Sequence, residues 1–156
     1  MISRQLFVYG TLLQGLRDDI RKRVHARFVG TGSIRARLYN LGRYPGAKPS
    51  TNSGDGATGE PHRVRGEVYR LPAPKAALIT LDEYEDIFPH VPGKSVFVRE
   101  LVSVTLDDGN ESQAWAYFYS RPVDESRLIE SGDYREFLGK RAIEAINQEI
   151  NDSIRD

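Results

Sequence analysis

Gln-Leu-Phe-Val-Tyr-Gly-Thr-Leu, residues 5–12, gives the first indication of both the architecture and a site. Residues 5–9 form a short apolar run, which predicts a buried strand, and Gly10 ends that run. A glycine lets the backbone approach a ligand closely, and successive N–H groups at such a turn can form an anion-binding nest. By itself the stretch is more often an ordinary strand end, so a function for it depends on the residues that fold around it.

Further short strands and helices are predicted along the chain. Alternating apolar residues predict strands after Gly32 within residues 28–41, over residues 63–71, and as a hairpin over residues 97–106 and 113–119. Helices are predicted over residues 16–26 and 75–81, and after Asp133, which can cap a helix with Glu136 as its capping-box partner. Residues 42–61 and 86–94 are rich in turn-forming residues and predict loops. This irregular mixture predicts an α+β domain around a small mixed sheet or barrel.

Charge balance and the lack of cysteine narrow the classes of function. The 156 residues, which we expect to form a single domain over residues 1–156, carry 22 Lys and Arg against 22 Asp and Glu. Without a basic field, non-specific binding of nucleic acid or of an anionic membrane is not expected. The absence of cysteine excludes disulfide scaffolds, thiolate nucleophiles, iron–sulfur clusters and Cys-containing zinc sites.

No membrane segment is predicted, because the longest uncharged stretch covers only residues 5–16, well short of a span. The N-terminus also shows no apolar run of the signal-peptide type. We therefore expect a soluble, cytoplasmic protein.

Two other patterns are weak as functional signals. Residues 54–59, Gly-Asp-Gly-Ala-Thr-Gly, match the letters of a dinucleotide fingerprint, but no strand precedes them and Pro61 follows, so we expect a loop. The histidines His25, His62 and His90 lie far apart in the sequence. A metal site is therefore not expected, and the reactive groups that remain are hydroxyls, amines and carboxylates.

Four carboxylates crowd into residues 82–86, directly after an apolar helical turn. A solvated acidic helix end is the simplest explanation, but acids are disfavoured near a helix C-terminus. Leu81 and Glu85 are four residues apart, so on a continuing turn they share the inward face. We therefore expect Glu85 to be a partly buried carboxylate, with Asp82 and Glu83 directed to solvent.

Five segments of the chain follow one another in an order known from one family. They read Tyr9-Gly10-Thr11-Leu12, Leu38-Tyr39-Asn40-Leu41-Gly42-Arg43-Tyr44-Pro45, Gly66-Glu67-Val68-Tyr69, Leu81-Asp82-Glu83-Tyr84-Glu85 and Trp115-Ala116-Tyr117-Phe118-Tyr119. The first four resemble, in this order, the signatures Y-G-[ST]-[LN], G-x-L-Y-x-L-G-x-Y-P, G-x-[VL]-[YF] and L-D-x-[YF]-E of the gamma-glutamylcyclotransferase-like superfamily. The fifth resembles the last core strand of the same superfamily. The resemblance covers roughly residues 5–134.

The resemblance implies a small mixed β-barrel of about five to six strands, flanked by two or three helices. It also implies an enzyme that cyclises a γ-glutamyl group to 5-oxoproline and releases an amine, without a metal or an organic cofactor. Glu85 matches the family's catalytic acid/base. The residues expected to bind this small-molecule substrate are Tyr9, Gly10, Thr11, Leu12, Tyr44, Pro45 and Tyr119. Among them, the backbone N–H groups of Gly10, Thr11 and Leu12 would bind the α-carboxylate or the developing oxyanion.

Departures from the family pattern leave the substrate open. Arg35 or Ala36 stands where the second signature begins with glycine, Phe97 replaces the usual tyrosine, and Asp86 replaces the Gly or Ser after the acid/base. The loops at residues 47–62 and 87–95 are long and could border the pocket. Free γ-glutamyl amino acids, glutathione, γ-glutamyl-ε-lysine isopeptides and a biosynthetic γ-glutamyl protecting group all stay open as substrates.

Two other functions also remain open. The same fold could carry a non-catalytic pocket that binds a small anionic metabolite. The stripe of Ile143, Ile146, Ile150 and Ile154 on the last predicted helix could instead dock on a partner, although we expect it to pack on its own barrel. The sequence does not indicate an oligomeric state.

Overall fold

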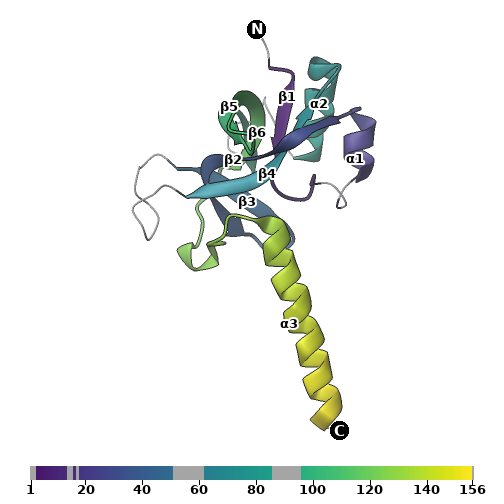
Figure 1. Ribbon diagram of the computed structural model, residues 1–156, viewed down its shortest axis with the longest axis vertical. Helices are drawn as coiled ribbons and strands as arrows, with labels where there is room; N and C mark the ends of the chain where they lie inside the picture. The colour runs from purple at the N-terminus through teal and green to yellow at the C-terminus, as the bar shows by residue number, and fades with distance from the viewer. Residues whose placement is uncertain (1–2, 14–15, 17, 51–61, 86–95, 156) are drawn as a thin grey trace.

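Six strands form one sheet that closes on itself (Figure 1). The computed structural model describes residues 3–13, 16, 18–50, 62–85 and 96–155. The strands are β1 (Gln5–Val8), β2 (Arg27–Asn40), β3 (Pro45–Pro49), β4 (Arg63–Arg70), β5 (Phe97–Leu106) and β6 (Glu111–Tyr119). Their order is β3-β2-β4-β1-β6-β5, and an additional β2–β5 pairing closes five of them into a barrel that β3 extends from β2. The predicted α+β fold with a small mixed barrel is therefore confirmed.

The barrel closes where β2 meets β5, and a glycine makes that closure possible. Gly32 lies opposite Leu106, and Ser33 lies opposite Thr105. A Cβ atom on Gly32 would stand 2.6 Å from the backbone oxygen of Thr105, closer than any side chain tolerates. The long strand β2 can therefore pair with β4 and then turn onto β5 only because this position has no side chain.

Strand β1 lies in the middle of the sheet and carries the first part of the site at its end. It runs antiparallel to β4, with Phe7 opposite Val68, and parallel to β6, with Leu6 opposite Trp115. The apolar run predicted from residues 5–9 is thus a buried strand, as expected. Its position between two partners fixes where the chain at Tyr9 and Gly10 leaves the sheet.

The helices are α1 (Asp18–Arg23), α2 (Pro74–Tyr84) and α3 (Tyr134–Arg155), with a short 3-10 helix, η1 (Glu125–Arg127). Helix α2 begins at a proline, which suits the first turn because its missing N–H has no helical partner there. It buries Ala77, Leu78 and Leu81 against the barrel. This face fixes the direction of the last turn of α2, which leads to the acidic residues. Among the described residues, no helix has both the length and the apolar character needed to cross a bilayer.

The first part of the predicted loop at residues 42–61 is a strand instead. Residues 45–49 read Pro-Gly-Ala-Lys-Pro and pair antiparallel with β2, with Asn40 opposite Pro45 and Ala36 opposite Pro49. Prolines are tolerated at the ends of an edge strand, so the partner strand overrides the turn-like composition. Residues 51–61, which include the fingerprint-like glycines, and the predicted loop at residues 86–94 lie outside the described residues.

Helix α3 starts as predicted but does not pack as predicted. The Glu136 amide donates to the Asp133 carboxylate at 3.2 Å, which confirms Asp133 as the cap. Phe137 and Leu138 pack against the core, and the helix then leaves the barrel, so that the C-terminus lies at its far end (Figure 1). The expectation that the isoleucine stripe packs on the barrel was wrong. Its exposed fractions are 60% for Ile143, 55% for Ile146, 50% for Ile150 and 75% for Ile154.

Candidate active site

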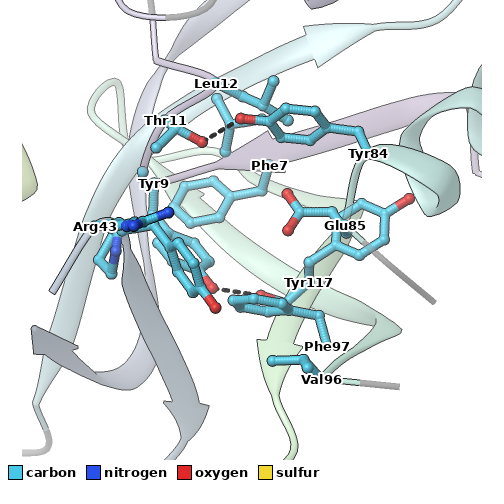
Figure 2. A pocket seen from close by; sticks show the side chains of 14 residues that line it. Phe7, Tyr9, Thr11, Leu12, Arg43, Tyr84, Glu85, Val96, Phe97 and Tyr117 are labelled. Atoms are coloured by element: carbon cyan, nitrogen blue, oxygen red, sulfur yellow. Dashed lines mark hydrogen bonds between the residues drawn. The ribbon is translucent and has the colours of Figure 1, made fainter. Parts of the chain in front are cut away.

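A cavity of about 410 Å³ opens at the end of β1 (Figure 2). Its walls come from the turn after β1, the segment that enters β3, the end of α2, the start of β5 and one residue of β6. The residues that line it are Phe7, Val8, Tyr9, Gly10, Thr11, Leu12, Arg43, Tyr44, Pro45, Tyr84, Glu85, Val96, Phe97 and Tyr117. Segments far apart in the sequence therefore meet at one pocket.

The turn after β1 offers backbone donors to this cavity. The Leu13 amide donates to the Gly10 carbonyl at 3.0 Å, and the side chains of Leu12 and Leu13 are buried, so the turn is anchored in the core. In the part of the chain that the structure describes, the amides of Gly10, Thr11 and Leu12 donate to no protein acceptor. Such unpaired N–H groups at a turn suit an anionic ligand.

Gly10 also has a packing reason to be glycine. A Cβ atom at this position would stand 2.8 Å from Cγ of Pro45. The absence of a side chain therefore allows the turn after β1 to lie against the first residue of β3, and both residues line the cavity.

The Tyr9 hydroxyl forms its hydrogen bonds with other residues of the protein. It donates to the Tyr117 carbonyl at 2.6 Å and accepts from the Ala47 amide at 3.1 Å. Burial, together with the charge of Glu85, holds the pKa of Tyr9 far above its usual range. Tyr9 thus connects the end of β1 to β3 and β6, and its ring forms part of the cavity wall. Its hydroxyl stays protonated.

Glu85 follows α2 and faces the cavity. Its amide donates to the Leu81 carbonyl at 2.9 Å, so the helical turn continues through Glu85 as the four-residue spacing predicted. Figure 2 shows its carboxylate pointing into the cavity. Burial, with the nearby charge of Asp82 as a second cause, raises the pKa of Glu85 to about 7. The expectation of a partly buried carboxylate is confirmed.

Asp82 does not point to solvent, so this expectation was wrong, whereas Glu83 is exposed as expected. The Tyr117 hydroxyl donates to Asp82 Oδ1 at 2.6 Å, and Arg99 Nε lies 3.1 Å from the same oxygen. The Arg99 guanidinium stacks over the Trp115 ring at 4.9 Å. Residues of β5 and β6 therefore hold Asp82 beside the site, where its negative charge raises the pKa of Glu85.

Two further polar groups complete the cavity. The hydroxyls of Thr11 and Tyr84 lie 2.6 Å apart, which joins the turn after β1 to the end of α2. Arg43 is exposed, lines the cavity and lies across from Glu85 in Figure 2. Among the described residues, no carboxylate pairs with its guanidinium. Among the described residues, the pocket thus has a buried carboxylate on one side and a guanidinium without a carboxylate partner on the other.

Most of the predicted site residues meet at this cavity. Those that line it are Tyr9, Gly10, Thr11, Leu12, Tyr44, Pro45 and Glu85. Tyr119 is not among the lining residues, because its ring packs at 5.7 Å against Phe97, which takes the place facing the cavity. The aromatic ring of Phe97 supplies no hydroxyl there, and Asp86 lies outside the described residues.

Sequence reasoning missed several lining residues. Tyr84 precedes the proposed acid/base and could have been found from the same turn of the helix. Arg43 lies within the second motif, but no pattern set it apart from the other arginines. Tyr117 lies between two other buried residues of β6, Ala116 and Phe118, and such an apolar run gives no signal for a side chain that reaches Asp82. In the described part of the chain, no group of three or more His, Asp or Glu side chains is arranged to hold a metal ion.

Comparison with known proteins places the chain in a family. The sequence pattern of the family described as Gamma-glutamyl cyclotransferase, AIG2-like, matches residues 6–136. A gamma-glutamylcyclotransferase family protein of Escherichia coli K12 is 35% identical over 131 residues, which are 83% of this chain and 95% of that relative.

Solved structures show the same fold. A mouse AIG2-like protein superimposes with a TM-score of 0.58 at 23% identity, over 86% of this chain and 89% of its own. An uncharacterised protein of Pyrococcus horikoshii superimposes with a TM-score of 0.59 at 23% identity, over 90% of this chain and 97% of its own. By fold, by motif order and by sequence, the chain belongs to the gamma-glutamyl cyclotransferase, AIG2-like family.

Proposed function

We propose that the protein converts a γ-glutamyl amine or γ-glutamyl amino acid to 5-oxoproline and the free amine, with Glu85 as general acid and base. The observation that carries this proposal is the Glu85 carboxylate, whose pKa is raised to about 7, directed into a cavity with unpaired amides at the turn after β1. The family of the chain supports a cyclotransferase-type activity.

Glu85 has a proton affinity that suits both halves of the reaction. The substrate's α-ammonium group, with an ordinary pKa of about 8, must lose a proton before its nitrogen can attack the γ-carbonyl carbon. Ionised Glu85 accepts that proton as the new C–N bond closes the five-membered ring. Protonated Glu85 then donates it to the leaving nitrogen as the old C–N bond breaks. The second proton that the ring nitrogen loses ends on the released amine, which leaves as an ammonium ion, so neither water nor a cofactor is consumed. A pKa near the working pH favours both transfers.

The turn after β1 supplies the electrostatic part of the mechanism. In the proposed complex, the free amides of Gly10, Thr11 and Leu12 bind the α-carboxylate or the oxyanion that forms on the γ-carbonyl oxygen. The bond between Thr11 and Tyr84 holds this turn at a fixed distance from the end of α2, which carries Glu85. Ring closure supplies its own proximity, so the protein needs mainly to hold the folded conformer of the substrate.

Arg43 points to an anionic substrate. Its guanidinium has no carboxylate partner in the described part of the chain and lies across the cavity from Glu85. A free cation at the rim attracts a ligand with net negative charge, such as a γ-glutamyl amino acid, whose leaving part adds a second carboxylate.

The test is 5-oxoproline formation from a panel of γ-glutamyl amino acids, glutathione and γ-glutamyl-ε-lysine. We expect turnover of at least one of these substrates, and a loss of about 10²–10⁴-fold in kcat for Glu85→Gln. Glu83→Gln removes a carboxylate from the same helical turn at an exposed position and serves as the matched control, with turnover unchanged.

Two outcomes contradict the proposal. One is the absence of 5-oxoproline across the whole panel. The other is full activity of Glu85→Gln. Thermal stabilisation by a γ-glutamyl compound without any product would favour the non-catalytic binding pocket instead.

A further inference from the structure

Three large side chains on one face of β5 and β6 lie beside the last turn of α2. Arg99 of β5 is directly opposite Tyr117 of β6 in the sheet, so their side chains share a face. Trp115 lies two residues before Tyr117 on β6 and therefore shares this face as well. Arg99 and Tyr117 both reach Oδ1 of Asp82, at 3.1 Å and 2.6 Å. This face of the sheet therefore holds one carboxylate of α2.

The position of the Arg99 guanidinium is fixed by the sheet. The guanidinium stacks over the Trp115 ring, with 4.9 Å between its central carbon and the ring centroid, which is a favourable contact between a cation and an aromatic face. The Trp115 indole is fixed in turn, because its N–H donates to the Ser3 carbonyl at 3.0 Å. The cation is therefore already in place on the sheet, and the Asp82 carboxylate turns toward it.

Asp82 and Glu85 form a close pair of carboxylates with different surroundings. They are three residues apart, which makes them neighbours on a helical turn, but only Glu85 lines the cavity. Among the described residues, Glu85 forms no ion pair, and Asp82 pairs with Arg99 alone. Arg99 is therefore the cation that compensates the charge of this pair.

The other polar groups around Glu85 do not replace this cation. Those that face it are Asp82 and Tyr84 of α2, Tyr9 after β1, Tyr117 of β6 and Arg43 before β3. The three tyrosines carry hydroxyls that are hydrogen bonded within the protein. Arg43 is exposed and lies across the cavity, where solvent screens its charge.

We propose that Arg99 is a positioning residue of the proposed reaction: its ion pair holds the Asp82 carboxylate against β5 and β6 and limits the repulsion between this carboxylate and ionised Glu85. The role in the reaction rests on the proposed function. Without the cation, the Asp82 charge is uncompensated and its side chain can turn toward Glu85. Two close carboxylates that lack a cation keep a shared proton up to a higher pH. A smaller share of the protein then carries the ionised base at neutral pH.

The pH profile of kcat/KM tests this role. Arg99→Met removes the cation but keeps an unbranched side chain that can cover the Trp115 ring. We expect the rising limb of the profile to move to higher pH by about half a unit. Arg99→Lys keeps the charge and should bring the limb back toward its original position.

Arg65→Met is the matched control. It also removes an Arg–Asp ion pair, the one with Asp107, from a position that does not line the cavity, and should leave the profile unchanged. A lower kcat/KM at every pH for Arg99→Met, with an unmoved limb, would mean that Arg99 only supports the fold. That result overturns the inference.

Carboxyl ¹³C NMR of the full chain follows the same titration without turnover. With the label at Cδ of glutamate, the signal that Glu85→Gln removes belongs to Glu85. We expect its titration midpoint to rise in Arg99→Met and to stay in place in Arg65→Met, while circular dichroism checks the fold of each variant. An unmoved midpoint in Arg99→Met overturns the inference, even in a protein that forms 5-oxoproline. A midpoint that moves in a protein without turnover supports the placement of Arg99 and contradicts the proposed function alone.

Discussion

Glu85 has an altered proton affinity because of its surroundings, and this carries a cost in stability. Its pKa is about 7 in the folded protein and near 4.5 in the unfolded chain, so the folded state binds more protons between these values. The free energy of unfolding therefore falls as the pH rises from about 4.5 to 7, and it stays lower above that range.

The first prediction follows from this linkage. Glu85→Gln removes the titration, so the variant should be more stable than the unsubstituted protein at pH 8, by up to about 3 kcal/mol. The difference should vanish at pH 4 and below, where Glu85 is protonated in both states. Thermal unfolding at both pH values measures it, with Glu83→Gln as the exposed control. Equal stability of Glu85→Gln and the unsubstituted protein at pH 8 would mean that the cavity does not desolvate the carboxylate.

The second prediction concerns the carboxylate beside Glu85. Asp82 raises the pKa of Glu85 by its charge and is held by Tyr117 and Arg99. Asp82→Asn removes that charge and frees the Arg99 cation, and both changes favour ionised Glu85. The rising limb of the kcat/KM profile should therefore move to lower pH, by about one unit. A profile that does not move, measured beside that of Glu83→Gln, would separate Asp82 from the proton transfer.

The sequence predicted the direction of a side chain in the site only where both residues concerned lie on one element. The spacing between Leu81 and Glu85 was enough to direct Glu85 inward, because both lie on one helix. Asp82 was placed wrongly because its partners come from β5 and β6, far along the chain. Tyr119 was predicted to line the cavity because it belongs to the last motif. Its ring instead packs against Phe97, which lines the cavity.

At the scale of the strand and helix, the sequence predicted those elements whose own residues form an apolar run or an alternation. Strands β1, β4, β5 and β6 show apolar runs or alternation, and each was found near its observed bounds. Strand β3 was missed, because two prolines and a glycine in five residues are typical of a loop. Its strand conformation comes from pairing with β2, a contact between segments that local sequence does not encode.

The third prediction tests the closure of the barrel. Gly32→Ala places a Cβ atom 2.6 Å from a backbone oxygen of β5, which cannot move aside as a flexible side chain could. We expect a loss of about 1–3 kcal/mol in the free energy of unfolding. Gly30→Ala lies two residues earlier on the same strand, where the nearest atom is 3.9 Å away, and should change stability little. Chemical denaturation measures both, and equal effects would show that closure tolerates a side chain.

At the scale of the whole molecule, the barrel and the projecting part of α3, residues 139–155, should respond differently to heating. The isoleucines of that part are at least half exposed, and a helix of this length is marginal in water without tertiary contacts. The fourth prediction is therefore that ellipticity at 222 nm begins to fall at a lower temperature than the fluorescence of Trp115 in the barrel begins to change. The protein has one tryptophan, so this signal reports the barrel alone. Coincident transitions of the two signals would contradict this prediction.

The parallel pairing of β1 with β6 has a consequence for the synthesis of the protein. The strand made first cannot complete its hydrogen bonds until the strand that contains Trp115 has been made. A ribosome-bound chain that stops before β6 therefore lacks Tyr117, whose carbonyl accepts a hydrogen bond from the Tyr9 hydroxyl and whose hydroxyl donates to Asp82. In a chain that stops before β6, the hydrogen bond between Thr11 and Tyr84 can still join the turn after β1 to the end of α2, but Tyr117 is missing beside Asp82. The proposed site is therefore complete only in a nearly finished chain.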